Sequence, residues 1–379
     1  MAYDLAILGG RVIDPATGLD EIADIAFQDD KVAAIGPGVG ENARETIRAG
    51  GLIVTSGLID LHTHIYWGGT SLGVDPDRYM AASGCTTLVD AGSAGPANFH
   101  GFRAHIVEPA AARVLAYINA SFAGIFAFSP TVMVGESGDI RLLNPSEVVR
   151  VAREHLDIVV GVKVRVGLVA SDGIGAAPLD IAIEAADALG LPVMAHLDHP
   201  PPSRLEVLSR LRPGDVLTHC YRPFPAAPTT ADGRVRDEVL AAREKGVVFD
   251  IGHGKGSFGW DVAGAMLAAG MPPDTISSDV HAISQHGPAY DQLVTMSKFL
   301  HLGMPIPDIV AASTINAAKA VGKPELGGLA VGGPGDAKFL RIEDGAFPLT
   351  AANGLTLEAP KRFRLAGDVR DGVWRAPGR

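Results

Sequence analysis

Residues 54–64 read VTSGLIDLHTH, and this stretch decides more about the fold than any other. An apolar run leads into two histidines, His62 and His64, which are separated by one residue. Side chains alternate along a strand, so both imidazoles should leave the same face, together with Asp60. A single His-x-His pair is explained equally well by two ordinary polar residues at the end of a strand. Its meaning therefore depends on what the other strands carry at their ends.

Seven more segments of this kind follow the first one. The expected strands are residues 58–65, 86–92, 114–121, 158–166, 191–198, 215–221, 246–253 and 275–280. Longer amphipathic segments, such as residues 178–190 and 236–246, lie between them and read as helices. Alternating strands and helices are typical of parallel βα units, so the pattern predicts an α/β protein with a (β/α)8 barrel of TIM type over residues 56–324. A doubly wound open sheet is the alternative.

Both ends of the chain are instead rich in short, strand-like segments. Residues 1–55 contain three of them, separated by turn clusters, and residues 325–379 contain three more. Neither end alone offers enough strands for a stable sheet. The sequence therefore predicts one small β-sandwich domain built from both termini.

Composition excludes several classes of partner. The 32 Lys and Arg residues stand against 43 Asp and Glu, a formal charge of -11, whereas nucleic acids and anionic membranes require a basic surface. Two cysteines give no disulfide framework, and no apolar run is long enough for a membrane span. We expect a cytoplasmic protein that acts on a small molecule and has neither nucleic acid nor membrane as partner; homo-oligomerisation stays open.

Metal-binding side chains recur at the ends of later strands, where barrel enzymes collect their functional groups. His196 ends the fifth expected strand, His219 the sixth and Asp279 the eighth. Imidazole and carboxylate are ligands that Zn²⁺ prefers, and core packing does not explain so many of them at strand ends. The recurrence predicts a metal centre at this end of the barrel.

The fourth strand, GVKVRV, adds an unusual pair. Its valines should face the helices, which turns Lys163 and Arg165 inward. Two unpaired cations inside a barrel are costly, so either both reach solvent beyond the rim or Lys163 is chemically changed. Carboxylation by carbon dioxide would turn Lys163 into an anionic carbamate that can bridge two metal ions.

These residues together resemble the binuclear metal-dependent amidohydrolase superfamily, and in particular its deacetylase and dihydroorotase-like subgroup. The segments HTHIYWGG, GHGKGSF and SSDVH carry the resemblance to the subgroup. The resemblance implies two divalent ions, expected to be Zn²⁺. The ligands that it implies are His62, His64 and Asp279 for the more buried ion and His196 and His219 for the other, with carboxylated Lys163 bridging both. Asp279 is also the implied proton shuttle.

One residue that departs from the pattern of the dihydroorotases narrows the class of substrate. Dihydroorotases usually carry an Arg two residues after His-x-His, where this chain has Tyr66. We therefore expect removal of an acyl group, expected to be acetyl, from a small carboxylate-bearing amide or ester, such as an N-acetyl amino acid or an O-acetyl α-hydroxy acid. The metal centre does not choose between amide and ester. The alternatives are a cyclic amidase of dihydroorotase or hydantoinase type and a catalytically silent structural barrel.

Three residues are candidates for binding that substrate. Arg165 suits a carboxylate, although pairing with a structural acid explains it equally well. Tyr221 could donate a hydrogen bond to a substrate carbonyl, and His281 could orient Asp279. The glycine-rich segment 251–260 is expected to be a substrate loop, although His253 within it could equally be solvated.

Overall fold

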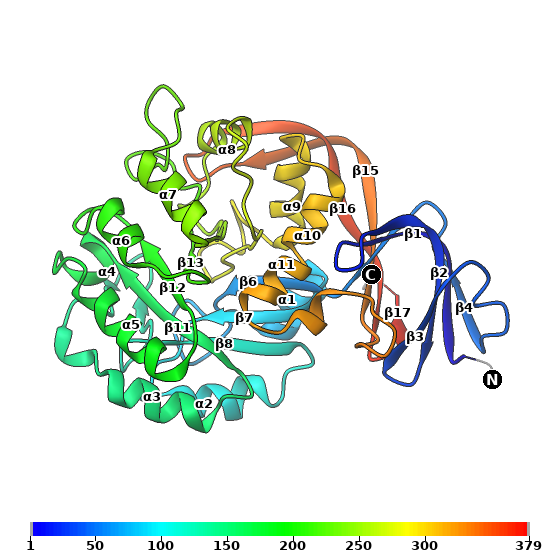
Figure 1. Cartoon of the computed structure of the whole chain (residues 1–379), viewed down its shortest axis with the longest axis horizontal. Coiled ribbons are helices and arrows are strands. Elements are labelled where there is room, and N and C mark those ends of the chain that lie inside the picture. The colour runs from blue at the N-terminus through cyan, green and yellow to red at the C-terminus, as the bar shows by residue number, and fades with distance from the viewer. Residues whose placement is uncertain (1–2, 377–379) are drawn as a thin grey trace.

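Seven parallel strands, hydrogen-bonded in chain order, form the central sheet of the computed structural model, which describes residues 3–376 (Figure 1). They are β6 (Leu58–Thr63), β7 (Cys85–Ala91), β8 (Arg113–Asn119), β11 (Val159–Val166), β12 (Val193–Leu197), β13 (Val216–Leu217) and β14 (Val248–Phe249). The eighth expected strand makes isolated parallel bridges, from Thr275 to Asp250 and from Val280 to Thr63. Because Asp250 follows β14 and Thr63 ends β6, these bridges close the ring. The α/β barrel is thereby confirmed, with its eighth strand reduced to bridges.

Helices follow most of these strands and surround the sheet (Figure 1). They are α1 (Pro76–Ser83), α2 (Phe99–Phe102), α3 (Pro145–Glu154), α4 (Leu168–Ser171), α5 (Ala177–Leu189), α6 (Arg204–Arg210), α7 (Asp237–Lys245), α8 (Trp260–Ala268), α9 (Gln292–His301), α10 (Ile306–Ala312) and α11 (Ile315–Ala320). Local sequence sets their ends. In α1 the Asp75 carboxylate accepts the first free backbone N–H groups, and Gly84 ends the helix at a φ of +70°.

Alternate strand residues supply two different hydrophobic cores. Ile59 and Leu61 of β6 join side chains from the other barrel strands inside the ring, together with Ala317 and Ala318 of α11. Leu58 belongs instead to the core that includes the surrounding helices. Apolar side chains and α11 thus fill one end of the barrel. The functional end is the other one, where the carboxyl ends of the strands meet.

Strands from both ends of the chain form one mixed sheet, in the order β17-β16-β15-β5-β1-β2-β3, with β4 paired to β1. Its members are β1 (Leu5–Asp14), β2 (Leu19–Gln28), β3 (Lys31–Gly36), β4 (Glu45–Arg48), β5 (Ile53–Ser56), β15 (Ala337–Thr350), β16 (Thr356–Arg370) and β17 (Val373–Arg375). The union of both termini is confirmed. Where we expected a sandwich, hydrogen bonding runs through one continuous sheet, because β5 pairs with both β1 and β15. The domain boundaries stay a prediction.

The long β15–β16 hairpin carries this sheet over to the barrel, where it runs along α9 (Figure 1). The backbone N–H of Phe363 donates to Ser297 Oγ of α9 at 2.9 Å, and that of Ala352 donates to the Phe258 carbonyl at 2.9 Å. Phe258 follows β14, within the expected substrate loop. The C-terminal hairpin therefore supports a segment that approaches the open end of the barrel.

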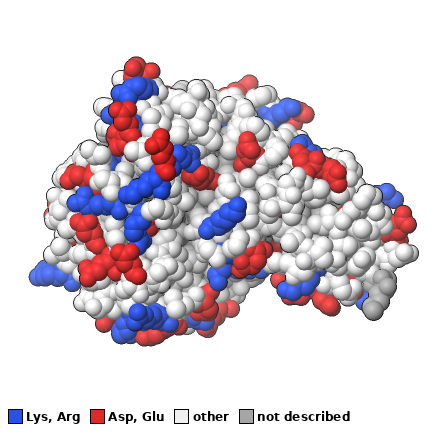
Figure 2. Space-filling model, in the orientation of Figure 1, with Lys and Arg blue, Asp and Glu red and all other residues white. Residues whose placement is uncertain are grey.

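The surface agrees with the composition of the chain. On the face drawn in Figure 2, acidic and basic side chains are interspersed over the barrel, without a broad basic area. Both cysteines, Cys85 and Cys220, are buried as free thiols. None of the helices within residues 3–376 is long and apolar enough to cross a membrane.

Candidate metal centre

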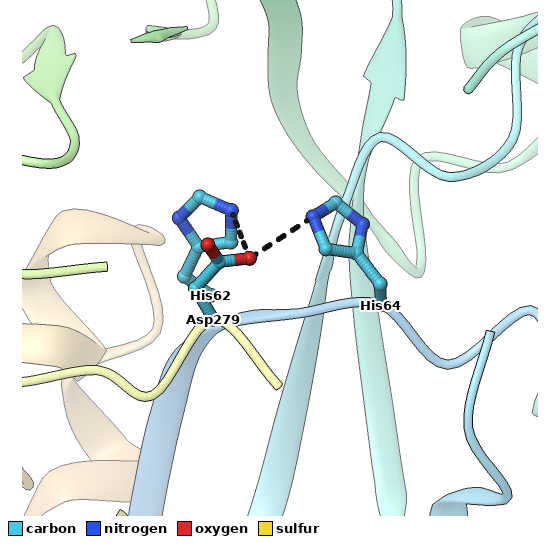
Figure 3. A group of neighbouring side chains, drawn as sticks. All are labelled: His62, His64 and Asp279. Atoms are coloured by element: carbon cyan, nitrogen blue, oxygen red, sulfur yellow. Dashed lines mark ion pairs between the residues drawn. The ribbon is translucent and has the colours of Figure 1, made fainter. Parts of the chain in front are cut away.

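His62, His64 and Asp279 converge at the open end of the barrel (Figure 3). Asp279 Oδ1 lies 3.4 Å from His62 Nε2 and 3.3 Å from His64 Nε2. All three side chains are buried, and their ligand atoms are close enough to hold one metal ion. Asp279 adopts a φ of +49°, a strained conformation that turns its carboxylate toward the histidines.

Hydrogen bonds on the far side of each ring fix the direction of the imidazoles. Thr218 Oγ1 donates to Asp250 at 2.7 Å, so its oxygen accepts from His62 Nδ1 at 2.7 Å. His64 Nδ1 is 2.9 Å from Ser93 Oγ. Such outer partners leave both Nε2 atoms free to bind a cation.

Lys163, His196 and His219 lie beside this group. The rings of His196 and His219 are 4.5 Å apart, and His219 is 5.0 Å from His62. His219 Nδ1 donates to the Gly252 carbonyl at 2.6 Å, which leaves Nε2 available. Lys163 Nζ and His196 Nε2 are buried without a hydrogen-bond partner in the described chain. Buried polar atoms are normally paired, so two unpaired nitrogens here are the observation that fits metal ligation.

Burial sets the protonation of these groups. It lowers the pKa of His64 to about 3 and holds the pKa values of His62, His196 and His219 well below the ordinary range. The imidazoles are therefore neutral, as metal ligands must be. Burial also lowers the pKa of Lys163 to about 7 and raises that of Asp279 to about 6. Lys163 is thus partly an uncharged amine at neutral pH, and Asp279 can exchange a proton there.

These side chains line a cavity of about 280 Å³ that also contains Arg165, Arg222 and His281. Arg165 lies here as the strand alternation predicted, and it pairs with a structural acid, whereas its binding of a substrate carboxylate stays a prediction. Its guanidinium donates to buried Glu136 at 3.1 Å, and it also lies over the Phe128 ring at 5.1 Å. The ion pair compensates for burying the charge while leaving Arg165 at the cavity wall.

His281 contributes a hydrogen-bond donor to the same cavity. Its Nδ1 accepts the backbone N–H of Ile283 at 3.2 Å, and burial lowers its pKa to about 4. The ring is therefore neutral with its proton on Nε2. Its role in orienting Asp279 stays a prediction.

Tyr221 is placed differently from the expectation. Its hydroxyl donates to the Met271 carbonyl at 2.6 Å, its ring is fully buried, and it is absent from the cavity wall. Arg222, the next residue along the chain, lines the cavity instead, although no motif pointed to it. The reason is local: β13 ends at Leu217, and His219 has a φ of +62°, so strand alternation does not extend to Tyr221. We therefore withdraw Tyr221 as a substrate-binding residue.

Asp60 likewise does not join the histidines. Its carboxylate accepts from Tyr79 Oη at 2.6 Å and from Ser278 Oγ at 2.5 Å, away from the cavity wall. The pairing of β6 with β7 shifts register between Asp60 and Thr63. A bulge of this kind interrupts alternation, so Asp60 and His62 no longer share a face.

The glycine-rich loop after β14 is only partly a solvated segment. Lys255, Gly256 and Ser257 line the cavity, but His253 is fully buried. His253 Nε2 accepts from Lys298 Nζ at 2.5 Å, and Lys298 also donates to the carbonyls of Pro288 and Thr350. Buried Lys298 thus ties this loop to α9 and to the C-terminal hairpin.

A closed α/β barrel with histidines and an aspartate at its strand ends defines a metal-dependent hydrolase fold and site. No family model matches the chain. A deacetylase from Agrobacterium fabrum is 36% identical over 86% of this chain and 80% of its own length. The chain belongs to these deacetylases of the amidohydrolase superfamily, and it is a hydrolase with a His-His-Asp metal site.

Among the solved structures that match nearly the whole chain, two are also more than 30% identical to it. One, described as an adenine deaminase, has a TM-score of 0.91 at 31% identity and covers 99% of this chain and 100% of its own. The other, described as a dihydroorotase, has a TM-score of 0.90 at 32% identity, with 99% of each chain covered. Relatives with such different names share one fold, so the reaction has to be argued from the site.

Proposed function

We propose that this protein is a zinc-dependent deacetylase that removes an acetyl group from a small carboxylate-bearing amide or ester. The substrates we expect are N-acetyl amino acids or O-acetyl α-hydroxy acids. The observation that carries the metal chemistry is the pair of buried, unpartnered nitrogens on Lys163 and His196, directly beside the His62, His64 and Asp279 group.

A second ion fits the donors that remain. His196 and His219 both offer a neutral imidazole, and Lys163 lies in the same cavity. The uncharged amine of Lys163 adds to carbon dioxide to give a carbamate and one proton. The product carries a carboxylate where protonated Lys163 would carry a buried positive charge, and divalent ions held at this site would compensate for that carboxylate. Gly92 leaves room for this residue, since a Cβ there would lie 2.5 Å from Lys163 Cβ.

Each residue then has a defined task. When bound, divalent ions supply the Lewis acidity that acidifies water and polarises the scissile carbonyl. Asp279 accepts the proton of the attacking water and returns it to the leaving nitrogen or oxygen. His281 Nε2 donates a hydrogen bond within the cavity.

Two cations select a substrate with a carboxylate. Arg222 is half-buried, its Nε is buried without a partner in the described chain, and burial lowers its pKa to about 10. Arg165 is paired with Glu136, and Arg222 and Asp198 lie on the wall of the same cavity. A carboxylate between the two would form charge-assisted hydrogen bonds.

A defined substrate panel tests the proposal with zinc-loaded protein. It contains both enantiomers of N-acetyl amino acids and of O-acetyl hydroxy acids, together with dihydroorotate, hydantoins and adenine. Turnover confined to the acetylated acids is the expected result. Turnover of the ring compounds alone would establish a cyclic amidase or a deaminase, and no turnover by protein that holds a full metal complement would refute the assignment.

The carboxylate contact has its own variant. Arg222→Gln should raise KM for carboxylate substrates about ten- to hundredfold, from the loss of one charge-assisted hydrogen bond. Arg204→Gln is the control, since Arg204 is a largely buried arginine of α6 that does not line the cavity. An equal effect of both substitutions, or activity on neutral amide analogues as high as on the acids, would exclude carboxylate recognition by Arg222.

A further inference from the structure

A second cavity, of about 850 Å³, adjoins the catalytic one, and we call it the outer cavity. Its wall comes from two segments that are distant in sequence, residues 126–142 after β8 and residues 169–177 after β11. Met133 and Val169 line both cavities. The two spaces are therefore neighbours that share a wall and are not separate features of the surface.

The wall of the outer cavity is mostly apolar, although Asp139 and Asp172 also belong to it. Six large apolar side chains on its wall are between 38% and 52% exposed. They are Phe126, Met133, Val134, Ile140, Val169 and Ile174. Scattered apolar residues are ordinary on a protein surface, but a contiguous group marks a binding site. The position of this group beside the catalytic cavity indicates which ligand it receives.

The outer cavity lies on the carboxylate-binding side of the catalytic one. Arg165 is the last residue but one of β11, four residues before Val169. Its partner Glu136 belongs to the segment 126–142 that forms the opposite wall. Phe128, under the Arg165 guanidinium, pairs in register with Met133 across the short strands β9 (Ala127–Phe128) and β10 (Met133–Val134). A substrate carboxylate at Arg165 would therefore place its α-substituent next to Met133 and Val169.

We propose that the outer cavity is a subsite for an apolar α-substituent of the substrate, which rests on the proposed function. The preferred substrates are acetylated amino or hydroxy acids whose side chain is an extended hydrocarbon group. The reacting acetyl group lies at the metal centre, the carboxylate at Arg165 and Arg222, and the side chain passes Met133 and Val169. The catalytic cavity of about 280 Å³ holds the first two parts, and the larger outer cavity holds the third.

A chain-length series measures this directly. The probes are N-acetyl derivatives of alanine, 2-aminobutyrate, norvaline, norleucine and 2-aminooctanoate. Each methylene that enters an apolar site should raise kcat/KM about three- to fourfold, the fold-change that burying one CH₂ gives. Titration calorimetry with the same compounds measures how the binding affinity depends on chain length, as a readout other than turnover.

The variants change only the outer wall. Ile140→Asp and Ile174→Asp replace half-exposed side chains, so folding is retained, and neither residue lines the catalytic cavity. They should abolish the gain from chain length while leaving N-acetylalanine hydrolysis unchanged. Ile22→Asp is the matched control, because Ile22 is 66% exposed on β2 of the terminal sheet.

The remaining outcomes contradict the subsite. A flat chain-length profile, or one that survives both aspartate substitutions, overturns it. So does a change of molar mass by light scattering in Ile140→Asp with an unaltered profile, which would make this face an interface between copies of the chain. Failure of metal-replete protein to hydrolyse both this series and the matching O-acetyl hydroxy acids refutes the proposed function instead, and the calorimetric affinities then test the outer cavity by themselves.

Discussion

Gly252 lies where the two groups of histidines meet, and replacing it with alanine tests how tightly the site is built. Its φ is +45°, and its carbonyl accepts from His219 Nδ1 at 2.6 Å. A Cβ at this position would overlap Thr218 Oγ1 and would lie 2.8 Å from His219 Nδ1 and 3.0 Å from His62 Nδ1. Gly252→Ala therefore displaces ligands of both expected ions at once.

The size of the effect follows from two costs. A left-handed backbone costs a residue with a Cβ about 1–2 kcal/mol. Forcing a methyl group into a packed site costs about 1–3 kcal/mol more, so stability should fall by about 2–5 kcal/mol. The ligands that move are also those that set the reacting geometry. Displacements of about 1 Å can cost about 100-fold in rate, and we expect a loss of that order in kcat/KM.

Three measurements check this expectation: metal content after reconstitution with excess zinc, kcat/KM on the best acetylated acid, and denaturant unfolding of the metal-free protein. Gly264→Ala is the control, because Gly264 of α8 has no atom near its missing Cβ, no left-handed φ and no place in the wall of the catalytic cavity. It should behave as the wild type. If Gly252→Ala keeps wild-type metal content and wild-type kcat/KM, the close packing described for this site does not govern its function.

Four further substitutions or conditions follow. Lys163→Ala should lose metal, measured by elemental analysis, and regain part of it with short carboxylic acids; a full metal complement without them would exclude the carbamate. In wild-type apoprotein, metal uptake should require bicarbonate and should rise as pH passes upward through about 7, because the fraction of Lys163 that is an uncharged amine increases there. Metal uptake that depends on neither bicarbonate nor pH would also exclude the carbamate. Asp279→Asn should keep much of the metal but lose most turnover, and near-normal rates in metal-replete protein would remove Asp279 as the shuttle. Lys298→Met should leave two buried acceptors and one partly buried acceptor without a donor, and stability in denaturant unfolding should fall by about 3 kcal/mol. An unchanged midpoint would show that this network is dispensable.

The barrel and the neighbourhood of its polar residues could be predicted from local patterns. Alternation along β11, a full eight-residue strand, correctly turned Lys163 and Arg165 toward the cavity. Short, nearly continuous apolar runs located the parallel strands, because a strand buried on both faces has to be apolar throughout its length. Where strands were short or bulged, the same rule failed, as at Asp60 and Tyr221.

The sequence by itself therefore determined the class of fold, the union of both termini in one β unit, and the strand ends at which His62, His64 and Asp279 lie. Only the tertiary structure decided which side chains contact one another at the site. It paired Arg165 with Glu136, brought Arg222 to the cavity, and buried His253 against Lys298. The physical reason is that periodicity reports which face a side chain leaves, whereas a partner 29 or 45 residues away along the chain is selected by packing. Contacts of this long-range kind, with Asp279, make the His62 and His64 pair part of a candidate metal site.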